Sequence, residues 1–115
     1  MDLKELQTPF KEALACHQGL RRLGFSSDDI YVMYSEGWLY IMLKTQGKEF
    51  NIDLGQVKCN EIEFPKIWAD IVETFNTGPE EQALSIWDNS VMKNNIKMIA
   101  DLIRKKGIMP PSLMN

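Results

Sequence analysis

Apolar residues alternate with polar or aromatic residues along positions 30–54, which is the spacing of β-strands with one buried face. Glu36-Gly37 and Gln46-Gly47 interrupt this stretch, and each pair suits a two-residue hairpin turn because glycine tolerates a positive φ. Three consecutive strands joined by such tight turns predict an antiparallel β-meander.

The two turns fix the pairing of the strands independently of each other. The first turn sets Val32 opposite Ile41, and the second sets Ile41 opposite Ile52 and Leu39 opposite Leu54. Both pairings place the aliphatic residues of all three strands on one face, and a slip of one residue in either hairpin would destroy that arrangement. We therefore expect this face to form the core.

A helix is predicted before the strands, because apolar residues between positions 10 and 20 recur at helical spacing. Thr8 is a suitable N-cap for this helix, and Pro9 fits its first position, where a backbone N–H is not needed. Gly24 suits the left-handed residue that ends a helix. Residues 26–29 are then expected to be a loop.

Three helices are predicted after the strands from the same spacing of apolar residues. Pro65 opens the first and Gly78 ends it, and Pro79 begins a short second helix. Ser90 is expected to cap the third, which ends at Gly107. The last eight residues contain two prolines and are predicted not to be helical.

The predicted fold class is therefore α+β, with an N-terminal helix, a three-stranded antiparallel β-meander, and three C-terminal helices packed on the sheet. The whole of 1–107 is expected to be a single domain, followed by a short tail at 108–115. A chain of 115 residues favours one domain.

The second face of the predicted sheet has an unusual composition. It combines aromatic residues and methionines with polar side chains on the third strand, and we take the following as candidate binding or interface residues: Tyr31, Met33, Trp38, Tyr40, Met42 and Asp53. Trp, Tyr and Met are enriched at the cores of protein interfaces. An uncovered patch of this kind would be larger than soluble monomers usually expose.

Charge and composition restrict the classes of partner. The net charge is −3, which disfavours nucleic acid and anionic membranes. No apolar run approaches the ~20 residues that a membrane span needs, and the first residues do not resemble a secretory leader. With two cysteines, Cys16 and Cys59, the chain has no disulfide framework. These features predict a soluble cytoplasmic protein.

No motif of a known catalytic, nucleotide-binding or metal-binding site is present. Cys16 and His17 are adjacent, so on a helix their side chains point about 100° apart and do not form a catalytic pair. His17 lies on the apolar stripe of the first helix and is expected to be a core or boundary residue. The sequence predicts no catalytic residue, no metal ligand and no cofactor.

Several functions remain compatible with the second sheet face. A C-terminal helix or the tail, with Ile108, Met109, Leu113 and Met114, would make the face ordinary core if it folded across it. We expect instead a non-enzymatic protein–protein interaction or adaptor module that forms a homo-oligomer through this face. The alternative is a small-molecule binding protein with an apolar pocket between helices and sheet, and the third possibility is a small enzyme.

Overall fold

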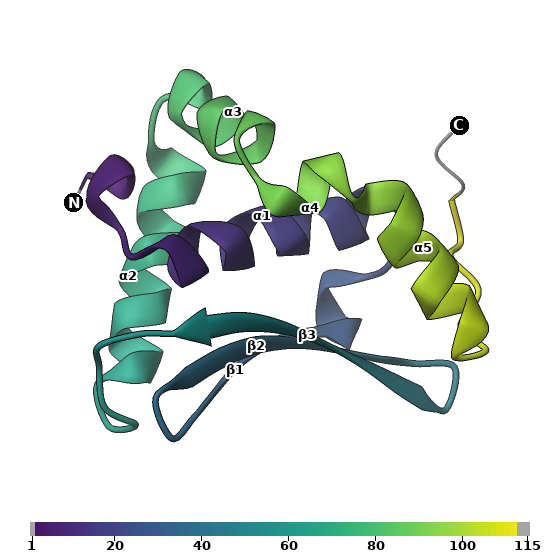
Figure 1. Cartoon of the computed structure of the whole chain (residues 1–115). Coiled ribbons are helices and arrows are strands. Elements are labelled where there is room, and N and C mark those ends of the chain that lie inside the picture. The colour runs from purple at the N-terminus through teal and green to yellow at the C-terminus, as the bar shows by residue number, and fades with distance from the viewer. Residues whose placement is uncertain (1, 113–115) are drawn as a thin grey trace.

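The structure is a computed structural model that describes residues 2–112, and its α+β order of elements agrees with the prediction (Figure 1). One antiparallel sheet contains the strands in sequence order, which are β1 (Ile30–Ser35), β2 (Trp38–Thr45) and β3 (Lys48–Gln56).

Among the described residues, five α-helices and two short 3₁₀ helices lie on one side of the sheet. They are η1 (Leu3–Glu5), α1 (Thr8–Arg22), η2 (Ser27–Asp29), α2 (Phe64–Thr77), α3 (Glu80–Asp88), α4 (Val91–Asn94) and α5 (Ile96–Lys105). The segment predicted as a loop before β1 thus includes one 3₁₀ turn. Within residues 2–112, none of these helices combines the length and apolarity required to cross a membrane.

Both hairpin turns have the predicted two-residue form. Glu36 and Gly37 have φ values of 52° and 85°, and Gln46 and Gly47 have 55° and 72°. Two successive positive φ values are typical of type I′ turns, whose twist matches that of the flanking strands. Every predicted pair between β1 and β2 is present, including Val32 opposite Ile41.

One predicted pair between β2 and β3 is wrong. Leu39 lies opposite Gly55, not opposite Leu54, while Tyr40 lies opposite Asp53. Leu54 is therefore an extra residue on β3, which makes a β-bulge. The cause is Gly55, whose φ of 126° is accessible to glycine and strained for other residues.

The helices lie on the aliphatic face of the sheet (Figure 1). Helix α1 crosses this face, α2 stands at the end with the β1–β2 turn, and α5 stands at the opposite end. Leu39, Ile41 and Leu43 of the central strand are fully buried, because both neighbouring strands and α1 surround them. This face is the hydrophobic core, as the register predicts.

The third predicted C-terminal helix is divided into α4 and α5. Ser90 does cap α4, since its side chain accepts a hydrogen bond from the backbone N–H of Lys93. The break falls at Asn95, whose side-chain amide donates to the carbonyl oxygen of Val91 at 2.9 Å. Asparagine competes in this way with the regular helical hydrogen bonds. At the first helix, Gln7 and not Thr8 holds the N-cap position.

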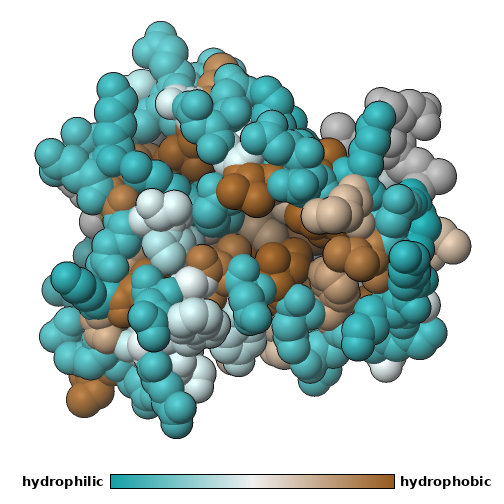
Figure 2. Space-filling view, viewed as in Figure 1, coloured by the Kyte–Doolittle hydropathy of each residue, from teal (hydrophilic) through white to brown (hydrophobic). Residues whose placement is uncertain are grey.

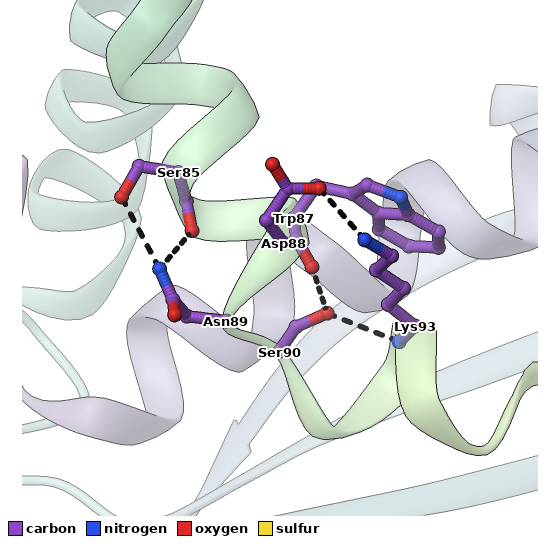
Figure 3. Close-up of polar contacts among 6 residues, drawn as sticks. All are labelled: Ser85, Trp87, Asp88, Asn89, Ser90 and Lys93. Atoms are coloured by element: carbon purple, nitrogen blue, oxygen red, sulfur yellow. Dashed lines mark hydrogen bonds and ion pairs between the residues drawn. The ribbon is translucent and has the colours of Figure 1, made fainter.

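A compact polar corner joins α3 to α4 (Figure 3). The buried Ser90 hydroxyl donates to the carbonyl oxygen of Trp87 at 2.7 Å, and Lys93 forms an ion pair with Asp88 at 2.9 Å. The carboxylate of Glu12 on α1 accepts a hydrogen bond from the first N–H of α4 at 3.1 Å. The Glu12 contact holds the start of α4 against α1, while the Ser90 and Lys93 contacts tie α4 to the end of α3.

The described part of the C-terminal tail lies against the domain. Ile108 is fully buried in the core between sheet and helices, and Pro110 is also buried. The backbone of Met109 exchanges two hydrogen bonds of 2.9 Å with the side chain of Gln46 in the β2–β3 turn. The N–H of Ser112 donates to the carbonyl oxygen of Leu23 at 2.9 Å.

Candidate functional site

The second sheet face lies on the side of the sheet that points away from all the helices (Figure 1). We call this surface, with the residues Tyr31, Met33, Trp38, Tyr40, Met42 and Asp53, the outer sheet face. Because side chains alternate along a strand, it carries the odd-numbered residues of β1 and the even-numbered residues of β2. The predicted site residues are therefore on one surface of the molecule.

Aromatic residues and methionines face each other across β1 and β2. Tyr31 lies opposite Met42, and Met33 lies opposite Tyr40. Trp38 stands at the β1–β2 turn, opposite Ser35. A methionine sulfur beside an aromatic ring makes a favourable contact, and its unbranched side chain adapts to differently shaped partners. The β1–β2 half of the outer sheet face is thus apolar and adaptable.

The exposure of this half is unequal. Trp38 is 42% exposed and Tyr31 is 43% exposed, whereas Met33, Tyr40 and Met42 are half-buried. Trp38 lies at the β1–β2 turn and Tyr31 on the edge strand β1, whereas Tyr40 and Met42 lie on the central strand. The exposed rings are the part of the surface that a partner would bury.

The β3 part of the outer sheet face is polar. Asp53, which lies opposite Tyr40, is exposed, and so are Glu49 and Asn51. The Asn51 side-chain amide donates to the Glu49 carboxylate at 3.1 Å. Asp53 therefore borders the apolar half and does not lie inside it.

The tail does not cover the outer sheet face in residues 2–112. Ile108 points into the core on the other side of the sheet, and Met109 is 62% exposed beside the β2–β3 turn. Leu113 and Met114 lie outside the described residues. Helix α5 is also on the aliphatic side (Figure 1), so no described segment makes this face ordinary core.

Sequence reasoning missed an apolar hollow beside the free edge of β3 (Figure 2). It has a volume of about 230 Å³, and its apolar lining comes from β3, α4 and α5 through Ile52, Leu54, Val91, Met92 and Ile99. The sequence assigns Ile52 and Leu54 to the core, but both are only partly buried. One feature of the sequence could have indicated this hollow. As the last strand of a meander, β3 is an edge strand, so no further strand covers its outer side.

A second concavity opens between α1, β1 and α2 and has a volume of about 260 Å³. Its walls are mostly apolar, with Leu14 from α1, Val32 from β1 and Val72 from α2. His17 and Gln18 of α1 also line it. The sequence predicts a pocket between helices and sheet as the alternative function without assigning residues to it, because the placement of α2 has no local signal.

The surroundings of Cys16 and Cys59 raise the pKa of both thiols. Cys16 is 2% exposed, and burial, followed by the negative charge of Glu12, raises the pKa of its thiol to about 12. The pKa of Cys59 is also raised, with burial as the main cause. A thiol with a raised pKa is a poor nucleophile at neutral pH. Cys16 is a core residue because it is buried.

His17 should make the stability of the fold depend on pH. Burial, with the positive charge of Arg21 as the second cause, lowers the pKa of His17 below its ordinary 6.5. The unfolded chain then takes up the proton first, so the free energy of unfolding is at its full value above about pH 6.5 and falls as the pH drops towards the folded-state pKa. Above pH 6.5 both states are neutral and this contribution is constant.

We expect His17→Gln to remove this dependence while leaving self-association unchanged. Urea unfolding at about pH 7.5, 6.5 and 5.5 measures how the free energy of unfolding changes with pH. Carboxylates contribute little to this change, because they titrate mainly below this range. An equally steep decline in wild type and variant would show that another group is responsible.

Comparisons of the chain with known protein families, with curated proteins and with solved structures gave no match in any of the three cases.

Proposed function

We propose that this protein is a non-enzymatic protein–protein interaction module that forms a homodimer through the outer sheet face. The observation that carries the proposal is the contrast between the two faces of one sheet. The aliphatic face of β2 is fully buried, while Tyr31 and Trp38 on the opposite face are 43% and 42% exposed, with no described segment over them.

The apolar area supports a weak dimer. Large aromatic side chains bury roughly 150–250 Å² each, so about 60–100 Å² of each exposed ring is still available to a partner. At about 25 cal/mol per Å², burying four such rings in a dimer contributes roughly 6–10 kcal/mol. Association costs about 4–15 kcal/mol, so the two terms are of similar size. A micromolar dissociation constant requires a net of about 8 kcal/mol, so the half-buried Met33, Tyr40 and Met42 must supply most of it through further contacts across the interface. With those contacts we expect a dissociation constant in the micromolar range.

A two-fold axis suits the division of the face into an apolar and a polar part. An axis that runs along the strands between β1 and β2 places each apolar half on the apolar half of the second copy. Asp53 and Glu49 then lie at the rim, where charged groups keep their contact with water. Such an interface is self-complementary, as two-fold symmetry requires. The rim carboxylates also oppose phosphate, which favours a protein partner over nucleic acid.

The proposed location is the cytoplasm. Cys16 and Cys59 are both free thiols. Unpaired cysteines are typical of the reducing environment inside cells, where disulfides are rare.

Sedimentation velocity tests self-association directly. We expect the weight-average sedimentation coefficient to rise from the monomer value to the dimer value between about 1 and 500 µM protein, because the dissociation constant lies within this range. A protein that remains monomeric throughout this range contradicts the proposal.

A further inference from the structure

Strand β3 is at the edge of the sheet, and its outer side has no neighbouring strand among the described residues. Bonded and non-bonded residue pairs alternate along an antiparallel ladder, and the residues that flank a two-residue turn form a bonded pair. Counting from the β2–β3 turn, the backbone N–H and C=O groups of Asn51 and Asp53 point away from β2. No described backbone group outside the sheet forms a hydrogen bond with either residue, so this edge has free donors and acceptors.

The apolar hollow beside β3 lies along the same edge (Figure 2). Ile52 and Leu54 form its wall on β3, and Val91 and Ile99 form its wall on the helices. Because side chains alternate along a strand, a further strand beside β3 would place every second side chain next to Ile52, on the side of the hollow. The hollow has a volume of about 230 Å³, which accommodates an aliphatic side chain of such a strand.

The other side chains of an added strand would lie beside carboxylates. Glu49 and Asp53 are exposed on the outer side of β3, and neither forms an ion pair within the described part of the chain. Lys44 lies opposite Glu49, whereas the residue opposite Asp53 is the uncharged Tyr40. Opposite charges on neighbouring strands stabilise a sheet and like charges destabilise it. The edge therefore favours lysine or arginine at these positions of an added strand.

A second copy of the chain is less suited to this edge. Two β3 strands that pair about a two-fold axis at Asn51, the centre of the free edge, would set Glu49 of each copy opposite Asp53 of the other. Charged side chains on edge strands are a common protection against such edge-to-edge pairing. The carboxylates thus favour a basic strand from a different protein.

We propose that the free edge of β3 and the hollow beside it bind an extended segment of another protein, in which aliphatic residues alternate with lysine or arginine. The backbone of the segment bonds to Asn51 and Asp53, its aliphatic side chains enter the hollow, and its basic side chains lie beside Glu49 and Asp53. Strand addition of this kind takes its affinity from main-chain hydrogen bonds and its specificity from pockets for alternate side chains. The site goes beyond the homodimer, which uses the apolar half of the outer sheet face on β1 and β2.

The probe for the test is the peptide acetyl-(Lys-Val)₃-amide, and acetyl-(Glu-Val)₃-amide is its acidic counterpart. In ¹H–¹⁵N NMR titrations of the full chain, we expect the basic peptide to shift the amide signals of Asn51 and Asp53 saturably, with a dissociation constant of about 1 mM or below. Hydrogen exchange of both amides should become slower, because each N–H gains an acceptor. The acidic peptide should bind at least about tenfold more weakly.

Two N-methylated peptides separate strand addition from general attraction between a basic peptide and an acidic protein. One carries N-methyl groups on its lysines and the other on its valines, so the two have equal charge and composition. Only every second N–H of an added strand points to β3, and these belong to the lysines in antiparallel pairing and to the valines in parallel pairing. We expect methylation of one set to weaken binding at least about tenfold and methylation of the other set to have little effect.

Variants of the protein test the carboxylates. Glu49→Gln combined with Asp53→Asn should bind the basic peptide about three- to tenfold more weakly at low salt. Asp70→Asn combined with Glu73→Gln is the matched control, since it removes the same charge from exposed positions of α2. This control should bind like wild type.

Several results would each overturn the proposal. They are the absence of saturable shifts up to about 5 mM basic peptide, equal affinities for the two N-methylated peptides, and equal losses in the β3 and α2 variants. Exchange of the Asn51 and Asp53 amides that slows with protein concentration in the absence of peptide would identify a second copy as the occupant. A homodimer through the outer sheet face leaves this exchange fast, because it does not pair the edge of β3, so failure of the dimer and failure of strand addition give different results.

Discussion

Ile41→Asp should leave the protein unfolded at room temperature. Ile41 is fully buried at the centre of the middle strand, opposite Val32 on one side and Ile52 on the other. The substitution removes a large apolar side chain, at a cost of about 2–5 kcal/mol, and it places a carboxylate where no described cation can pair with it, which costs several kcal/mol more. The sum is comparable to the roughly 5–15 kcal/mol that stabilises a whole domain.

Met42→Asp is the matched control, because it introduces the same group at the next position of the same strand. Met42 lies on the outer sheet face opposite Tyr31, where an ionised carboxylate keeps its contact with water. We expect circular dichroism to report an unfolded chain for Ile41→Asp and a cooperative thermal transition for Met42→Asp. A folded Ile41→Asp protein with the melting temperature of wild type would mean that the assignment of the two faces is wrong.

The register of the sheet could be predicted because two independent signals agree on it. The period of two along each strand assigns faces, and Gly37 and Gly47 mark the two-residue turns, which the structure confirms. The bulge at Leu54 had no such signal. Gly55 has the position of an ordinary strand end in the sequence. Its φ of 126° and the approach of Pro9, whose Cγ lies 3.3 Å from the position a Cβ would take, both appear only in the folded structure.

Helix boundaries were predictable where glycine or proline sets them and less so elsewhere. Gly24, with φ of 95°, and Gly107, with φ of 86°, end helices as expected. The break between α4 and α5 was not foreseen, because Asn95 lies within a continuous apolar spacing and interrupts the helix through its own side-chain hydrogen bond.

The outer sheet face and the concavity beside Gln18 also differ in how far the sequence could predict them. Alternation along the strands placed the residues of the outer sheet face correctly on one surface, since that is a local property of the backbone. Whether anything covers this surface depends on where α5 and the tail pack, which is set by contacts between residues far apart in the sequence, such as Ile108 with the core. The cavity beside Gln18 depends likewise on the approach of α2 to α1 and β1.

Trp38→Glu combined with Tyr40→Lys should convert the proposed dimer into a folded monomer. Both side chains belong to the apolar half of the outer sheet face, and Trp38 is one of its two most exposed rings. The pair leaves the net charge unchanged, so general repulsion does not contribute. In the monomer both new side chains reach water, whereas in the dimer they would be buried against apolar side chains at a cost of several kcal/mol. We expect at least about a hundredfold weaker dimer, which corresponds to roughly 2.7 kcal/mol.

Leu84→Glu combined with Met98→Lys is the matched control on other surfaces. Leu84 on α3 and Met98 on α5 are 47% and 54% exposed, so this pair also replaces two exposed apolar residues with one acid and one base. Sedimentation velocity at about 100 µM should show the control as dimeric as wild type and the sheet-face variant as a monomer with the same circular dichroism spectrum. A sheet-face variant that remains a dimer would move the interface away from β1 and β2. If the control dissociates instead, the interface involves the helices, because exposed apolar residues on α3 and α5 then hold the two copies together.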